Sequence, residues 1–390
     1  MDRLSLTLPE GLATLTRVLG AEEGDIRLVG GAVRDTLAGL PPKDFDMATR
    51  LMPEAVMQRA QAAGYKVIPT GLAHGTVSVL ANGRPIEVTT LRRDVSTDGR
   101  HATVAFSDDW RDDAARRDFT INALYADPLT GEVFDYFGGR DDLAAGIVRF
   151  IGDPLTRIAE DHLRILRFFR FQARFGSGAP DAASLAACTA RANDLMALSR
   201  ERIADELLRL LALPDPGETV ALMVERGIFR PVLPEIQDAA LIILARVVKA
   251  EAQLGLAPDA LRRLSALLPD DPAQVDGVGA RLKLSNAQRK FLAASAARDA
   301  TDGADPKALV YRLGHDVALA RLMAGGFDVT PILDWEIPVF PLGGRAVMAR
   351  GISAGPEVAR ILQAVESKWV AEGFPGEGRV ETLLEEVTGG

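Results

Sequence analysis

The chain has 390 residues, a formal net charge of −9, 47% hydrophobic residues and 25% charged residues, an ordinary composition for a globular protein of about two to four domains. The negative charge argues mildly against a protein that coats nucleic acid, although it is compatible with a locally basic groove. A single cysteine, Cys188, excludes an internal disulfide and removes any argument for a thiolate zinc site.

No apolar run approaches the ~18 residues that a membrane helix requires. The N-terminal stretch MDRLSLTLPEGL lacks the basic segment and apolar core of a secretory signal. We therefore expect a cytoplasmic protein with no membrane partner. The sequence indicates no obligatory protein partner.

The chain opens with alternating helix and strand patterns. An amphipathic helix is predicted within residues 1–25, and a strand over residues 26–29 leads into Gly30 and Gly31. A glycine pair lets the backbone approach a ligand closely, as in loops that bind phosphate. A helical turn carrying Arg34 is expected to follow it.

A pair of carboxylates comes next. If residues 43–47 form a strand, its period of two places Asp44 and Asp46 on one face. Mg²⁺ takes oxygen ligands, commonly one or two carboxylates together with substrate phosphates. The pair therefore indicates a metal-dependent nucleotide site, with a turn or surface role as the alternative. Residues 53–64 are predicted to form a helix.

A β-hairpin is predicted next, over residues 74–80 and 84–91, because Asn82-Gly83 suits a tight type I′ turn. On its second strand Glu87 would face away from the apolar residues. An unpaired carboxylate is costly among apolar neighbours, so Glu87 either joins the two aspartates or is an ordinary solvent-facing residue.

The polar segment 92–102 is predicted to be a mobile loop. Residues 116–123, RRDFTINA, are expected to open a helix, and a short strand is predicted near residues 133–136. Arg117, Asp118 and Asn122 of this segment could contact triphosphate or ribose. The alternative is charge arranged around a helix dipole.

Only helices are predicted beyond residue 143, so the chain has an α+β organisation. Residues 214–217, 231–234 and 268–279 are candidate joints between helical units. Within EDHLRILRFFRF, Asp161 and Arg164 are at i, i+3 and so would face the same way on a helix. They could read a base edge, or form an intrahelical ion pair.

The four histidines are dispersed without metal-ligand spacing, and no G-x-S-x-G or Walker motif is present, so serine hydrolase and P-loop chemistry are unsupported. The remaining motifs, taken together, resemble the tRNA nucleotidyltransferase/poly(A) polymerase family, specifically its bacterial (class II) CCA-adding enzymes. The motifs occur in the family's order over residues 28 to 211: GGAVRD with DFDMAT, IEVTTLRRD, DGRH, RRDFTINAL, FGGRDDLAAGIVRFIGDP, EDHLRILRFFRFQARF and SRERIADELLRLL.

The resemblance implies a nucleotidyltransferase head of the polymerase-beta type, with a mixed sheet and helices, followed by an all-helical neck, body and tail. We expect the head at residues 1–142, the neck with base recognition at 143–213, the body at 214–300 and the tail with tRNA contact at 301–390. The implied reaction is template-independent addition of CCA, from CTP and ATP, to the tRNA 3′ end, with release of pyrophosphate.

The resemblance also assigns roles. Asp44 and Asp46 would bind two Mg²⁺ ions and Glu87 would complete the catalytic acids. The nucleotide would be held by a larger set: Gly30, Gly31 and Arg34 at the triphosphate, Arg117, Asp118 and Asn122 around the nucleotide, Asp161 and Arg164 at the base edge, and Arg167 in support. Alternatives are poly(A) or A-only addition, a catalytically inactive RNA-binding module, and a phosphate-sensing regulator. The segment VSTDGRHA favours full CCA or A addition.

Overall fold

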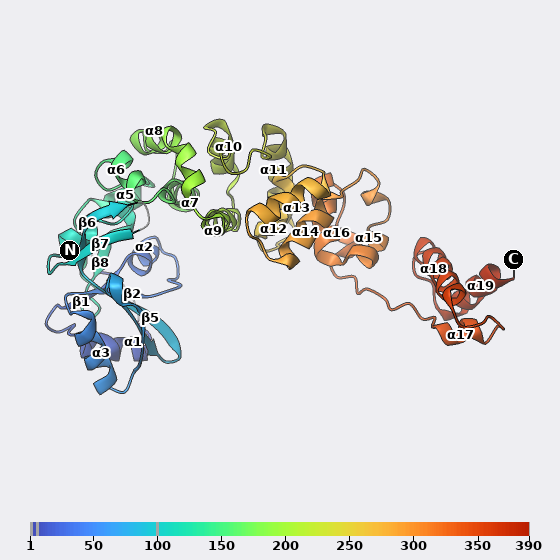
Figure 1. The fold of residues 1–390 in the computed structure, drawn as a ribbon, viewed down its shortest axis with the longest axis horizontal. Helices are drawn as coiled ribbons and strands as arrows, with labels where there is room; N and C mark the ends of the chain where they lie inside the picture. Colours follow the sequence, from blue (N-terminus) through green and yellow to red (C-terminus); the bar gives the residue numbers. More distant parts are fainter. Residues whose placement is uncertain (1–2, 5–7, 99–100, 390) are drawn as a thin grey trace. The chain divides into compact units, whose positions relative to one another are not determined.

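The computed structural model describes residues 3–4, 8–98 and 101–389, with the backbone alone at residues 94–98 and 101–104. The chain, coloured from blue at its N-terminus to red at its C-terminus in Figure 1, divides into two compact units, residues 1–234 and 235–390. The boundary falls at the predicted joint 231–234. The finer division into head, neck, body and tail stays a prediction.

The first unit contains a mixed sheet, as predicted, and this sheet has seven strands. Its strands lie in the order β3-β4-β5-β2-β1-β8-β9. Their bounds are β1 Ile26–Val29, β2 Asp46–Thr49, β3 Lys66–Gly71, β4 Thr76–Ala81, β5 Arg84–Thr90, β8 Leu124–Ala126 and β9 Val133–Asp135. Strands β2 and β5 are parallel, and the other pairs are antiparallel. Neither β3 nor β8 was expected from the sequence.

Helices cover the sheet because alternate strand residues are apolar on each face. Helices α1 (Glu10–Val18) and α3 (Pro53–Ala62) share a core with strand residues such as Leu28 and Met47. The other face packs Val29 with Trp110 of α4 (Trp110–Ala115). The short helix α2 (Gly31–Leu37) follows β1 and contacts it (Figure 1).

The predicted hairpin is confirmed as β4 and β5. Asn82 and Gly83 have φ angles of 49° and 76°, the two positive values that a type I′ turn requires. Ile86 is buried and Glu87 is exposed, as the period of two predicted.

Two predictions that concern strands were wrong. Segment 92–102 is not a loop, because β6 (Arg92–Asp98) and β7 (His101–Phe106) pair as an antiparallel hairpin, with residues 99 and 100 outside the described residues. The polar composition predicts a loop, but the two polar segments form strands because they pair with each other. The strand predicted over residues 43–47 begins only at Asp46, so Asp44 precedes it.

The rest of the first unit is helical. It contains α5 Gly139–Ala145, α6 Pro154–Glu160, α7 Arg164–Phe175, α8 Ala182–Ala190, α9 Arg200–Leu211 and α10 Gly217–Glu225. Short 3₁₀ helices of the chain are η1 Leu72–His74, η2 Thr120–Asn122, η3 Ala192–Ala197, η4 Asp302–Ala304 and η5 Thr330–Ile332. In α7 the apolar face, with Phe168 and Phe169, is buried in this unit.

The second unit is entirely helical. It contains α11 Asp238–Gln253, α12 Ala260–Leu267, α13 Pro272–Arg281, α14 Asn286–Ala296, α15 Pro306–Leu313, α16 His315–Gly325, α17 Gly344–Met348, α18 Pro356–Ala371 and α19 Glu377–Thr388. Of the joint predicted over residues 268–279, only residues 268–271 lie between helices, because α13 includes the others. Within the described part of the chain, no helix is both long enough and apolar enough to span a bilayer.

Candidate nucleotide-binding and active site

A cavity of about 380 Å³ in the first unit brings the predicted residues together. Every predicted nucleotide-binding residue lines it, and Asp46 does too, whereas Asp44 and Glu87 do not. The lining residues are Gly30, Gly31, Arg34, Asp46, Arg116, Arg117, Asp118, Asn122, Asp161, Leu163, Arg164, Arg167, Phe171 and Arg202. Arginines outnumber aspartates in this list, so the cavity suits an anion.

At one end of the cavity Gly30 turns the chain from β1 into α2. Its backbone, with φ 67° and ψ −119°, occupies a region that is accessible almost only to glycine. A Cβ atom there would lie 3.6 Å from Nη1 of Arg117 and 3.7 Å from the carbonyl oxygen of Asn122. The glycine therefore keeps the backbone in an unusual conformation next to a cationic side chain.

Arg34 is buried beside this turn. Its Nε and Nη2 donate to Oδ1 of Asp35, at 2.9 and 2.6 Å, and its Nη1 donates to Oδ1 of Asn122. The guanidinium lies over the rings of Phe171 and Phe175. Burial lowers the pKa of Arg34, and the neighbouring Asp35 carboxylate opposes that effect.

Asp118 joins the sheet side of the cavity to helix α7. It accepts hydrogen bonds from the backbone NH of Phe119 and Nδ2 of Asn122, both at 2.9 Å, and from Nε of Arg167 at 2.7 Å. Burial alone would raise the pKa of Asp118, but Arg167 and Asn122 hold it at about 2. Asp118 is therefore a fixed anion at neutral pH.

Arg116 and Arg117 follow α4 at its C-terminal end, so the helix start predicted at this cluster was wrong. The helix begins earlier, at Trp110, where Asp109 caps it by accepting from the NH of Arg111 at 2.8 Å. The two arginines are then at the end where a helix dipole favours cations. Both pair with Asp113, through N–O distances of 2.6 Å for Arg116 and 3.0 Å for Arg117.

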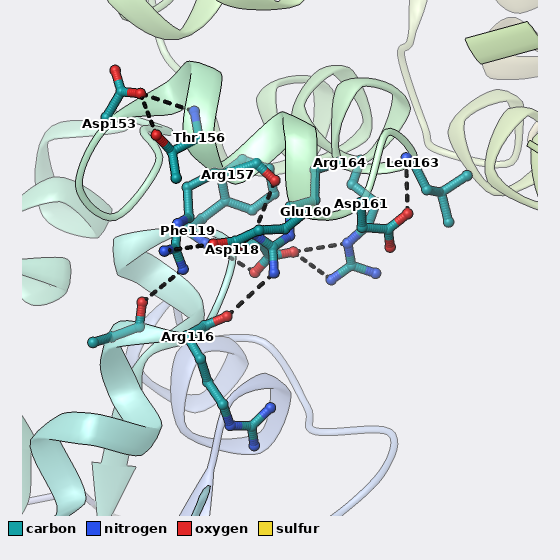
Figure 2. Close-up of polar contacts among 12 residues, drawn as sticks. Arg116, Asp118, Phe119, Asp153, Thr156, Arg157, Glu160, Asp161, Leu163 and Arg164 are labelled. Carbon is teal, nitrogen blue, oxygen red and sulfur yellow. Dashed lines mark hydrogen bonds and ion pairs between the residues drawn. The ribbon is translucent and has the colours of Figure 1, made fainter. Parts of the chain in front are cut away.

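The other end of the cavity is formed by the turn between α6 and α7. The single helix predicted through Asp161 and Arg164 is wrong, because Asp161 is extended (φ −152°, ψ 106°) and Arg164 begins a new helix. The break has a local cause: Oδ1 of Asp161 accepts from the NH of Leu163 at 3.1 Å (Figure 2), a local side-chain bond of the Asx-turn type that competes with helix continuation.

The two predicted base-reading residues do not pair with each other. Arg164 donates to Oε2 of Glu160 at 2.5 Å and to the carbonyl oxygens of Arg157 and Arg116 at 3.0 and 3.2 Å (Figure 2). Nη2 of Arg202 donates to Oδ2 of Asp161 at 2.8 Å. Arg202 was missed as a site residue, although its motif SRERIADELLRLL was among those that carry the resemblance.

Comparison with known proteins identifies the family of this chain. The profile of the "Poly A polymerase head domain" matches residues 26–149, and that of the "Probable RNA and SrmB- binding site of polymerase A" matches residues 179–240. A mouse protein named mitochondrial CCA tRNA nucleotidyltransferase 1 is 35% identical over 94% of this chain and 87% of its own length. A CCA-adding enzyme of Latilactobacillus sakei is 30% identical over 91% and 92% of the two chains. The chain belongs to the family of CCA-adding enzymes.

Solved structures of CCA-adding enzymes share the fold. The Bacillus stearothermophilus enzyme in complex with CTP gives a TM-score of 0.71 at 26% identity, over 97% of this chain and 98% of that one. The Thermotoga maritima enzyme complexed with tRNA gives 0.73 at 20% identity, over 100% and 98%. The predicted α+β fold, with a mixed sheet followed by helices, is thereby confirmed.

Of the three acids that the resemblance assigns to Mg²⁺ and catalysis, Asp46 lines the cavity. Met47 pairs with Val88 across the parallel strands β2 and β5, so Asp46 and Glu87, the residues just before them, are cross-strand neighbours on the opposite face. The pKa of Asp46 is raised to about 6, chiefly by burial. The negative charges of Glu87 and, less strongly, Asp44 act in the same direction, and the positive charge of Arg117 opposes them.

The arrangement fits a metal that completes its coordination with substrate. Among the described residues, no group of three or more His, Cys, Asp or Glu side chains is placed to hold a metal ion on its own. Mg²⁺ needs only one or two carboxylates when phosphates and water supply the remaining oxygens. The carboxylates near Asp46 repel one another, and a divalent cation between them would relieve that repulsion.

Proposed function

We propose that this chain adds CCA to the 3′ end of tRNA, using CTP and ATP and releasing pyrophosphate. One observation carries the proposal: a single cavity is lined both by the Gly30–Arg34 turn and by the Asp161–Arg164 turn. The first suits a triphosphate and the second suits the edge of a base. The cavity therefore has the two ends that selection of a nucleotide without a nucleic-acid template requires.

The triphosphate end is made of backbone and arginine. Gly30 and Gly31 would admit phosphate oxygens close to the main chain, and Arg34 would neutralise their charge. Arg117 reaches the same side of the cavity, because its Nη1 is the atom nearest to a Cβ built on Gly30. Asp118 and Asn122, hydrogen-bonded to each other, would face the ribose.

The base end offers one acceptor and one donor. Cytosine and adenine each present an exocyclic amino group beside a ring nitrogen that accepts, so Asp161 can accept from the first while Arg164 donates to the second. Uracil and guanine present a carbonyl oxygen at the position of that amino group and would meet the carboxylate unfavourably. Arg167 follows Arg164 by about one turn of α7 and is hydrogen-bonded to Asp118, so it would support the Asp161–Arg164 segment.

The reaction is an in-line transfer. The 3′-hydroxyl of tRNA gives up its proton to solvent and its oxygen bonds to the α-phosphorus. The bond between that phosphorus and the α,β-bridging oxygen breaks, and its electron pair leaves with pyrophosphate. Asp44 and Asp46 would hold two Mg²⁺ ions beside Glu87, and these ions, when bound, would neutralise charge and lower the pKa of the attacking hydroxyl. The arginines orient the triphosphate, because phosphoryl transfer depends mostly on positioning and on neutralising charge.

The remaining assignments rest on the relatives. A head at residues 1–142, a neck at 143–213, a body at 214–300 and a tRNA-contacting tail at 301–390 are proposed from the family's organisation. The cytoplasmic location also stays a prediction, since relatives from mouse and human are named as mitochondrial.

The test supplies the full chain with Mg²⁺ and a tRNA that lacks its last three nucleotides. CTP with ATP should give a product ending in CCA, and CTP alone a product ending in CC. Addition of A only to tRNA that already ends in CC would show an A-adding enzyme instead, and long A tails on unrelated RNA would show a poly(A) polymerase. Asp46→Ala should abolish incorporation with an unchanged circular dichroism spectrum, and near-normal turnover would contradict the metal assignment.

A further inference from the structure

Asp35, next to the arginine assigned to the triphosphate, is a buried carboxylate that the proposed function leaves without a role. Only 4% of the residue is exposed. Its Oδ1 accepts from Arg34, at 2.9 and 2.6 Å, and its Oδ2 accepts from Nη2 of Arg174 at 2.8 Å. A single carboxylate thus holds one guanidinium from α2 and one from α7.

Arg174 is at the far end of the helix that begins with Arg164. It follows Arg167 by seven residues, two helical turns, so both side chains leave the same face of α7. Arg167 pairs with Asp118 at 2.6 Å and Arg174 with Asp35 at 2.8 Å. These two ion pairs fix the position of α7 along the sheet side of the cavity.

Aromatic contacts reinforce the link. The guanidinium of Arg34 lies 4.5 Å, and that of Arg174 4.9 Å, from the centroid of the Phe175 ring. Because two cations share one carboxylate, removal of Asp35 would leave Arg34 and Arg174 repelling each other in a buried place. Such an arrangement is sensitive to the loss of any one of its three members.

We propose that Asp35 and Arg174 are a positioning pair that holds Arg34 and helix α7 in one register, so that triphosphate binding and base reading occur in the same geometry. The inference rests on the proposed function, because it takes Arg34 as a phosphate contact and Arg164 as a base contact. Neither member of the pair lines the cavity. Both act through residues that do.

The experiment compares Asp35→Asn, Arg174→Gln, the double variant and Arg174→Lys in the full chain. Kinetics are measured with CTP, ATP and UTP on tRNA lacking its last three nucleotides or its last one, at a temperature where all variants are folded. Asp35→Asn and Arg174→Gln should each raise the KM for the correct nucleotide, and the rate of UTP incorporation relative to CTP, about tenfold, the size of one charge-assisted hydrogen bond.

The double variant should be no worse than Asp35→Asn alone, because the two side chains act as one unit. Arg174→Lys should restore most of the selectivity, since Arg174 gives Asp35 one donor atom and an ammonium can replace it. The pairing would be contradicted if the change in KM or selectivity in the double variant were the product of the changes in the two single variants. It would also be contradicted if Arg174→Lys did not recover selectivity.

Glu251→Gln is the matched control. Glu251 is also a buried carboxylate that accepts from two arginines, Arg262 at 2.8 Å and Arg263 at 2.7 Å, but it lies in the second unit. It should lower thermal stability without changing nucleotide selectivity. If Asp35→Asn behaves like this control, with KM and selectivity within twofold of wild type, the positioning role is refuted and the proposed function survives. Wild-type protein that adds neither C nor A would refute both.

Discussion

The replacement Asp113→Asn tests whether buried charge holds the arginines of the cavity in place. Asp113 is 1% exposed and accepts from Arg116 at 2.8 Å, Arg117 at 3.0 Å and the hydroxyl of Tyr125 at 2.7 Å. Burial would raise the pKa of Asp113, but Arg117 and Arg116 hold it at about 2, against an ordinary value of 3.8. That difference corresponds to stabilisation of the folded state on the order of 2–3 kcal/mol at neutral pH.

The stabilisation by Asp113 should decrease as the pH is lowered. Because the pKa is lower in the folded state, this stabilisation is fully present above about pH 4 and is lost as the pH falls toward 2. The asparagine variant lacks the titrating group. Its deficit in unfolding free energy relative to wild type should therefore be constant from about pH 5 to 7 and shrink below pH 4. The contributions of other titrating groups cancel in this difference, because both proteins contain them.

The assay needs a signal from the first unit alone, because a chain of two units does not unfold in a single two-state step. Trp110 supplies it, packed edge-on against Tyr125 at a centroid distance of 5.6 Å. In a background with Trp335→Phe and Trp369→Phe, urea unfolding followed by fluorescence reports on this region. A deficit below about 0.5 kcal/mol, within the range of ordinary surface substitutions, or one that does not change down to pH 3, would refute the reasoning.

Two further substitutions address the ends of the cavity. Gly30→Ala should cost about 1–3 kcal/mol of strain in its φ region and raise the KM for ATP and CTP with a smaller effect on kcat. Steady-state kinetics check this, and an unchanged KM would contradict the role of the turn. Arg202→Ala should release Asp161 and raise UTP incorporation relative to CTP about tenfold, measured on tRNA lacking its last three nucleotides, and unchanged discrimination would show that Arg202 does not hold the carboxylate.

The sequence was informative where structure is determined locally. The hairpin β4–β5 was predictable because Asn82-Gly83 selects its own turn, and alternation along β5 then gave the exposed face of Glu87. The glycine turn before α2 was predictable for the same reason, since Gly30 adopts a conformation that few other residues accept. Each of these features depends on neighbours within a few positions of the chain.

Features that no residue pattern signals were missed, whether their partners are near or distant in the chain. Hairpin β6–β7 consists of polar segments that form strands by pairing with each other. The break at Asp161 needs no proline or glycine, because one side-chain acceptor ends α6 and begins α7. The ion pair between Asp35 and Arg174 joins residues 139 positions apart, and no spacing rule connects them. The resemblance named most of the residues that line the cavity, although not Arg202, and it named none of the contacts that hold them.

These contacts change how nucleotide selection is to be understood. Each arginine that lines the cavity already has a carboxylate partner: Arg34 with Asp35, Arg116 and Arg117 with Asp113, Arg164 with Glu160, Arg167 with Asp118, and Arg202 with Asp161. An incoming nucleotide therefore shares or exchanges existing partners instead of neutralising free cations. General affinity for phosphate is reduced by this pairing, while the direction of each donor is fixed. If Asp161 and Arg164 read the base as proposed, a wrong base would gain little from them, because it would have to replace their existing bonds without compensation, and specificity would follow from that difference.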